Sequence, residues 1–138
     1  MASDATPAGE GESRLMGTDL KRARRTADLA HRVVARLKEA GLPDKLDPEV
    51  SCLGTDLGDL WAAGKELDER LEALLASPQD WDSLGDSLVD LRATVDHIGW
   101  HARRARKPTR ALARFAYRKA AQAERTTAAR QGREVSSA

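Results

Sequence analysis

Cysteine, aromatic residues and β-branched residues are all scarce in this chain. Its 138 residues include one cysteine, one isoleucine, six valines and five aromatic side chains. A single cysteine, Cys52, cannot close an internal disulfide, which excludes a disulfide-stabilised secreted domain and favours a reducing compartment. The shortage of strand formers argues against a β-rich fold.

Long apolar runs are also missing. The longest uninterrupted apolar stretches are a few residues, far short of the roughly 20 that span a bilayer. No apolar secretory core follows Met1, and 33% of the residues are charged. We therefore expect no membrane-bound segment and a cytoplasmic location.

Alanine and leucine supply most of the apolar residues. The chain has 24 alanines and 17 leucines, and both residues are strong helix formers. The composition therefore predicts an all-α fold.

Prolines, glycines and capping residues divide the chain into helical segments. We expect a disordered leader over 1–16, one helical domain over 17–131, and a disordered tail over 132–138. Within the domain the punctuation predicts helices over about 18–40, 48–76, 80–107 and 109–131. Gly41 is placed to end the first helix, Pro48 to begin the second, and Asp80 to cap the third.

Apolar residues recur with 3,4 spacing in the second and third helices. The second helix has such a seam in Val50, Leu53, Leu57, Leu60, Gly64, Leu67, Leu71 and Leu74, and the third in Trp81, Leu84, Leu88, Leu91, Val95, Ile98, Ala102 and Ala105. The short connection between them predicts an antiparallel hairpin. We expect an antiparallel bundle of three to four long helices, in which Pro108 either starts the last helix or kinks a continuous third one.

Small residues form a second face on the predicted helix over 48–76. Gly54, Gly58 and Ala62 recur at intervals of four, away from the leucine seam. Glycine inside a helix costs about 0.5 to 1 kcal/mol relative to alanine, so a close helix approach should offset the cost. The approaching helix belongs either to the same chain or to another subunit of an oligomer.

Charge is sorted along the sequence. Residues 42–100 hold 14 acidic and 4 basic side chains (net −10), and residues 101–138 hold 2 acidic and 11 basic (net +9). The first 41 residues add 8 basic and 6 acidic side chains, so the total of +1 conceals a strongly dipolar molecule. We expect Asp82, Asp86 and Asp90 to form an acidic outer face of the third helix.

Arginines dominate one face of the last predicted helix and, if the helix passes through Pro108, of the residues before it. Guanidinium groups bind phosphate oxygens and stack on bases, and carboxylates are the alternative partner. The candidate binding residues, for nucleic acid or for an acidic partner, are Arg103, Arg106, Lys107, Arg110, Arg114, Arg118, Arg125 and Tyr117.

Catalytic and metal-binding patterns are not found in the sequence. His97 and His101 have the i, i+4 spacing that can hold one metal, but no His-Glu-X-X-His motif or Glu-X-X-His motif surrounds them. Cys52 has no neighbouring histidine, and no serine lies in a Gly-X-Ser-X-Gly context. We expect no enzyme activity, no cofactor, no metal and no small-molecule substrate.

Two hypotheses follow for the function. In the first, a non-catalytic accessory or assembly protein binds the backbone of RNA or DNA through its basic C-terminal helix while docking on a protein partner or on itself. In the second, the chain is a structural subunit that forms homo- or hetero-oligomers, and the basic helix packs on the acidic second and third helices.

Overall fold

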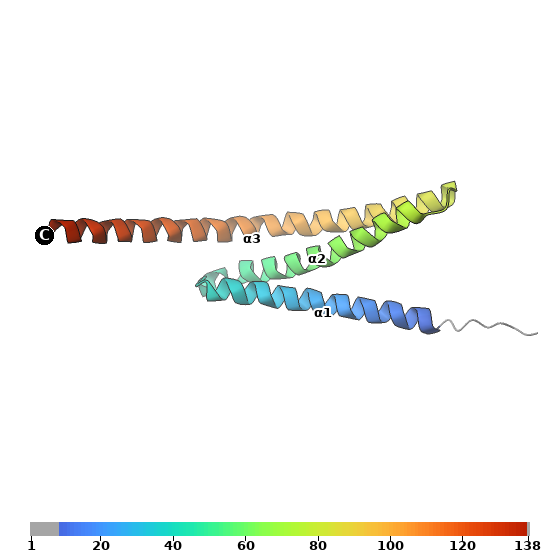
Figure 1. Ribbon diagram of the computed structural model, residues 1–138, viewed down its shortest axis with the longest axis horizontal. Helices are drawn as coiled ribbons and strands as arrows, with labels where there is room; N and C mark the ends of the chain where they lie inside the picture. Colours follow the sequence, from blue (N-terminus) through green and yellow to red (C-terminus); the bar gives the residue numbers. More distant parts are fainter. Residues whose placement is uncertain (1–8, 138) are drawn as a thin grey trace, which may run out of the picture.

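The computed structural model describes residues 9–137, with side chains from Gly17 onward, and shows an all-helical chain (Figure 1). The helices are α1 (Gly9–Glu39), α2 (Asp47–Ala76) and α3 (Trp81–Ser136), and a 3-10 turn covers Asp44–Leu46. No strand occurs among residues 9–137, which confirms the all-α prediction. Within these residues, no helix combines the length and the apolar character that crossing a membrane requires.

The three helices form an open arrangement. In Figure 1, α2 lies between α1 and α3, and each successive helix runs back along the previous one. α2 packs against both neighbours. The predicted hairpin is therefore present as α2 and α3, and the described chain has three α-helices where three to four were expected.

Both ends of the helical region extend further than the sequence predicted. α1 begins at Gly9, so it includes residues 9–16 of the expected leader, while residues 1–8 lie outside the described part of the chain. α3 continues to Ser136 rather than ending near 131. Adding residues to an existing helix is much cheaper than nucleating a new one, which explains why residues without a packing partner remain helical.

The turn between α1 and α2 follows the sequence signals with one exception. Gly41 adopts a φ of +97°, which favours glycine, and its N–H donates to the Lys38 carbonyl at 3.0 Å. Pro48 lies in the first turn of α2 as predicted. Asp47 does not cap α2; its carboxylate accepts a 2.6 Å hydrogen bond from the Lys38 Nζ.

Asp80 caps the start of α3, as its position predicted. Its carboxylate accepts hydrogen bonds from the Ser83 backbone N–H at 2.8 Å and the Ser83 hydroxyl at 2.9 Å. These donors stabilise the ionised carboxylate and lower the pKa of Asp80. The cap is thus complete above the usual aspartate pKa and weakens as the pH falls through the lowered value.

Pro108 lies inside α3 and does not end it. The helix is 56 residues long and passes through the proline, so no fourth helix begins there. Proline removes the N–H that would bind the carbonyl four residues earlier. The ring is buried beside Pro48 and Cys52 of α2, and the next residue, Thr109, donates its hydroxyl to the Ala105 carbonyl at 2.6 Å.

Replacing Pro108 with alanine should stabilise the fold. Alanine restores a helical hydrogen bond and relieves a proline cost of about 3 kcal/mol, and the removal of the packed ring offsets only part of this gain. We expect the melting temperature to rise by about 3–6 °C. Circular dichroism during heating would measure it, with Ala113→Pro at an exposed site as the control, which should lower the helical signal. A lower melting temperature for Pro108→Ala would contradict this account.

The apolar core is small and lies at the end of the molecule near the 3-10 turn. Its buried members come from α2 and α3, and α1 and the α1–α2 connection contribute partly buried side chains. The buried residues are Val50, Leu53, Ala105 and Leu112, packed by Val34, Leu37, Leu42 and Leu46.

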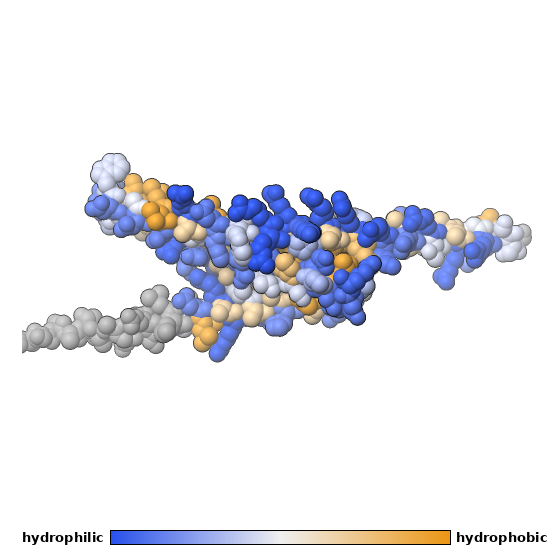
Figure 2. All heavy atoms as spheres, turned by 180° about the vertical axis from the view of Figure 1, so that it is seen from behind, coloured by the Kyte–Doolittle hydropathy of each residue, from blue (hydrophilic) through white to orange (hydrophobic). Residues whose placement is uncertain are grey.

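The other end of the α2–α3 hairpin has no third helix over it. Apolar side chains gather around the α2–α3 turn (Figure 2), where Leu75 and Trp81 are each 86% exposed. Even seam residues such as Leu71 and Leu88 are about half exposed. Because α1 diverges from α3, the heptad seams are buried fully only near the core.

Candidate functional site

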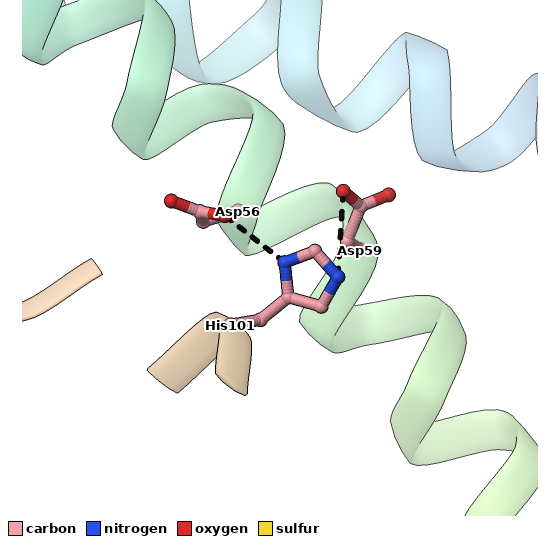
Figure 3. Close-up of side chains that lie close together, drawn as sticks. All are labelled: Asp56, Asp59 and His101. Atoms are coloured by element: carbon pink, nitrogen blue, oxygen red, sulfur yellow. Dashed lines mark hydrogen bonds and ion pairs between the residues drawn. The ribbon is translucent and has the colours of Figure 1, made fainter. Parts of the chain in front are cut away.

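A buried polar cluster joins α2 to α3. Asp56 is fully buried on α2, His101 is 5% exposed on α3, and the half-buried Asp59 lies one turn after Asp56. The His101 ring lies between the two carboxylates (Figure 3): Nδ1 is 3.0 Å from Asp56 Oδ1, and Nε2 is 3.7 Å from Asp59 Oδ2.

Further side chains surround this cluster. The Cys52 thiol donates to Asp56 Oδ2 at 3.4 Å, and Arg104 Nε lies 3.9 Å from Asp56 Oδ1. The Arg104 guanidinium also lies over the Trp100 ring, 4.6 Å from its centre. Asp56 is thus compensated by donors from both helices, as a buried carboxylate requires.

The cluster is built to hold two helices together. The nearest ligand atoms of Asp56, Asp59 and His101 lie within 4.8 Å of one another, which is within reach of one small cation. Zinc sites use three or four protein ligands, whereas here Asp56 already accepts hydrogen bonds from His101 and Cys52. We interpret the group as a hydrogen-bonded clamp that fixes the register of α2 against α3.

His97 does not complete this group. Its ring meets the His101 ring edge to face, with centres 4.6 Å apart, but His97 is exposed whereas His101 is buried. The i, i+4 spacing therefore places the two histidines in different environments.

The pairing of His101 with Asp56 was not predicted from the sequence, although a signal for it exists. Asp56 lies 20 residues before the end of α2, and His101 lies 20 residues after the start of α3. An antiparallel hairpin brings such positions together.

The predicted basic residues lie along the exposed side of α3 and beyond the core. Leu112 is the last buried residue, and the 24 residues after it, 113–136, form a helical extension that projects alone (Figure 1). We call residues 113–136 the basic arm; it carries six basic and two acidic side chains. All the predicted binding residues are exposed: Arg103, Arg106, Lys107, Arg110, Arg114, Arg118, Arg125 and Tyr117.

The small-residue face of α2 packs against α1. A Cβ added at Gly54 would lie 2.9 Å from the Ala30 carbonyl oxygen, and one added at Gly58 would lie 2.7 Å from that of Thr26. Ala62 lies at the edge of the same groove between α1 and α2. The close approach that the sequence predicted thus occurs within one chain.

The predicted acidic face is at the other end of α3 from the arm. Asp82, Asp86 and Asp90 are all exposed, and Asp90 lies 3.4 Å from Arg70 of α2. Since the basic and acidic faces are on one unbroken helix, they do not meet each other within the chain.

Comparison with known proteins gives no relative. No family model, no curated protein and no solved structure matches this chain. The function must therefore be argued from the residues and their arrangement.

Proposed function

We propose that this chain is a non-catalytic accessory or assembly protein that binds the phosphate backbone of RNA or DNA through α3. The binding surface consists of the exposed arginines and lysine before the core ends, together with the basic arm. The observation that supports this proposal best is that α3 continues for 24 residues past its last buried side chain. A helix that contributes nothing to the core beyond Leu112 leaves its side chains available to a ligand.

Electrostatics favours a polyanion as that ligand. Residues 101–138 carry a net charge of +9, and each arginine that contacts a phosphate releases condensed counterions. The contacts are made to the backbone, so little sequence specificity is expected. Tyr117, which is 77% exposed, is available for base stacking.

The opposite end of the molecule is suited to a different role. The acidic α2–α3 hairpin repels phosphate, and its exposed Leu75 and Trp81 offer apolar contact area to a protein. The proposal therefore gives the protein partner the hairpin and the nucleic acid the basic end. It places this activity in the cytoplasm, which the lone cysteine favours.

Neutralising the arginine face tests this proposal. Replacing Arg110, Arg114 and Arg118 together with alanine should weaken binding to a fluorescein-labelled 20-base RNA and to a 20-base-pair DNA duplex. Because three arginines no longer reach phosphate, the slope of log K against log salt on DNA should become shallower by about 2.7. Fluorescence anisotropy at several salt concentrations measures both the affinity and the slope.

A charge-preserving variant provides the control for that experiment. Replacing the same three arginines with lysines keeps the charge and should retain most of the salt slope. If the unaltered protein binds neither probe at low salt, the proposal is wrong. Equal binding by the alanine variant would instead show that these arginines do not touch the nucleic acid.

A further inference from the structure

The side of α3 that faces away from α2 presents one continuous stripe. The buried residues Thr94, His101, Ala105, Pro108 and Leu112 mark the side that packs on α2. Across the helix from them, one position recurs every seven residues, and all its members are exposed. This outer stripe consists of Asp86, Ala93, Trp100, Lys107 and Arg114.

The charges of the outer stripe are arranged symmetrically about Trp100. Asp86 lies 14 residues before Trp100 and Arg114 lies 14 residues after it, which is two heptads, or about 21 Å, in each direction. The bordering charges repeat the pattern. Asp82 and Asp90 lie 18 and 10 residues before Trp100, and Arg118 and Arg110 lie 18 and 10 residues after it.

Such a surface is complementary to its own antiparallel copy. A two-fold axis exchanges the two ends of a helix, so that residue i of one subunit faces residue j of the other and the reverse contact follows automatically. We propose that a second copy of this chain binds along the outer stripe in antiparallel orientation, with Trp100 at the two-fold axis and each Asp86 facing Arg114 of the partner subunit.

Trp100 supplies the apolar centre of this interface. Its side chain is 47% exposed, and its ring is held by Arg104 on one side and by an edge contact with His101, 4.7 Å between centres. Val89, which is 68% exposed, borders the stripe. A fixed, exposed tryptophan at the centre of a contact with charges around it is the usual arrangement of an interface hot spot.

The second copy also covers surface that one chain leaves open. A single helix in water is only marginally stable without packing, and the basic arm has no partner among the described residues of its own chain. In the antiparallel arrangement the arm of each subunit extends toward the acidic hairpin of the other. The net charges of +9 for residues 101–138 and −10 for residues 42–100 then offset each other between subunits. The unbroken passage of α3 through Pro108 is essential, because only one continuous helix carries both ends of the stripe.

This dimer and the binding of nucleic acid use some of the same arginines. Arg110, Arg114 and Arg118 contact the second copy in one case and phosphate in the other, so the two partners compete. The dimer requires only complementarity between copies, so it does not depend on the proposed function.

A charge exchange between Asp86 and Arg114 tests the dimer. Sedimentation equilibrium at low salt should give the unaltered protein about twice its 15.0 kDa chain mass. Asp86→Arg alone, or Arg114→Asp alone, creates two like-charge contacts across the axis and should weaken dimerisation on the order of tenfold to a hundredfold. The double variant Asp86→Arg, Arg114→Asp restores both pairs and should recover the dimer.

Glu72→Arg is the matched control, since it makes the same charge change at an exposed position of α2 and should leave the dimer intact. Circular dichroism verifies that each variant is folded. The proposal is overturned if the unaltered protein sediments as a monomer at low salt, or if the folded double variant dimerises no better than the single ones. RNA binding by the same proteins separates this result from the proposed function, because the exchange leaves an aspartate at position 114, which cannot bind phosphate.

Discussion

Replacing Gly58 with alanine should destabilise the fold by about 1–3 kcal/mol, although alanine is the better helix former. The added Cβ would lie 2.7 Å from the Thr26 carbonyl oxygen and 3.3 Å from the Thr26 Cγ2. The nearest atom belongs to the backbone of α1, so a side-chain rotation cannot relieve the clash. The two helices must move apart, and this movement loosens the packing between them. Urea unfolding followed by circular dichroism measures the change.

Gly64 provides the control within the same helix. An added Cβ there meets no atom of the described residues within 4 Å, so Gly64→Ala should stabilise the protein by about 0.5–1 kcal/mol. The same chemical change is therefore expected to have opposite signs at two positions six residues apart in α2. Equal effects at both positions would show that α1 does not approach α2 at Gly58.

Removing the carboxylate of Asp56 should cost about 3 kcal/mol or more, because it leaves His101 without the partner of its Nδ1 in a buried site. Thermal and urea unfolding of Asp56→Ala measure this loss. The half-buried Asp59, whose carboxylate is 3.7 Å from the ring, is the control, and Asp59→Ala should cost much less.

A paired replacement separates the clamp from simple packing. Substituting both Asp56 and His101 with leucine removes both polar groups together, and such exchanges are often neutral or stabilising. We expect Asp56→Leu with His101→Leu to be more stable than Asp56→Ala alone. A double variant less stable than the single one would mean that the polar pair itself, rather than the avoidance of an unpaired group, stabilises this interface.

Local signals predicted the features that local chemistry decides. The start of α2 at Pro48, the glycine conformation at Gly41 and the cap at Asp80 depend on a few neighbouring residues, and the structure confirms them. Pro108 differs because two effects compete there. The proline rule describes the missing hydrogen bond, whereas the buried position of the ring against α2 depends on a helix far away in sequence.

Tertiary register limited the prediction of the site. The exposed basic side chains of α3 were predicted as a surface, because their spacing along one helix is visible in the sequence. The pairing of Asp56 with His101 requires that two helices be aligned to within one turn, and no single helix contains that information. The divergence of α1 is similarly invisible, since the seam of α2 has the same sequence whether Leu71 is covered or half exposed.

The continuity of α3 has a consequence for how the molecule responds to charge. Asp86 and Arg114 are separated by about 42 Å along one helix, several times the screening length of about 8 Å at physiological ionic strength. The acidic and basic ends therefore act as electrostatically independent bodies joined by a rigid spacer. A polyanion or a polycation each meets an oppositely charged surface, and the net charge of +1 describes neither encounter.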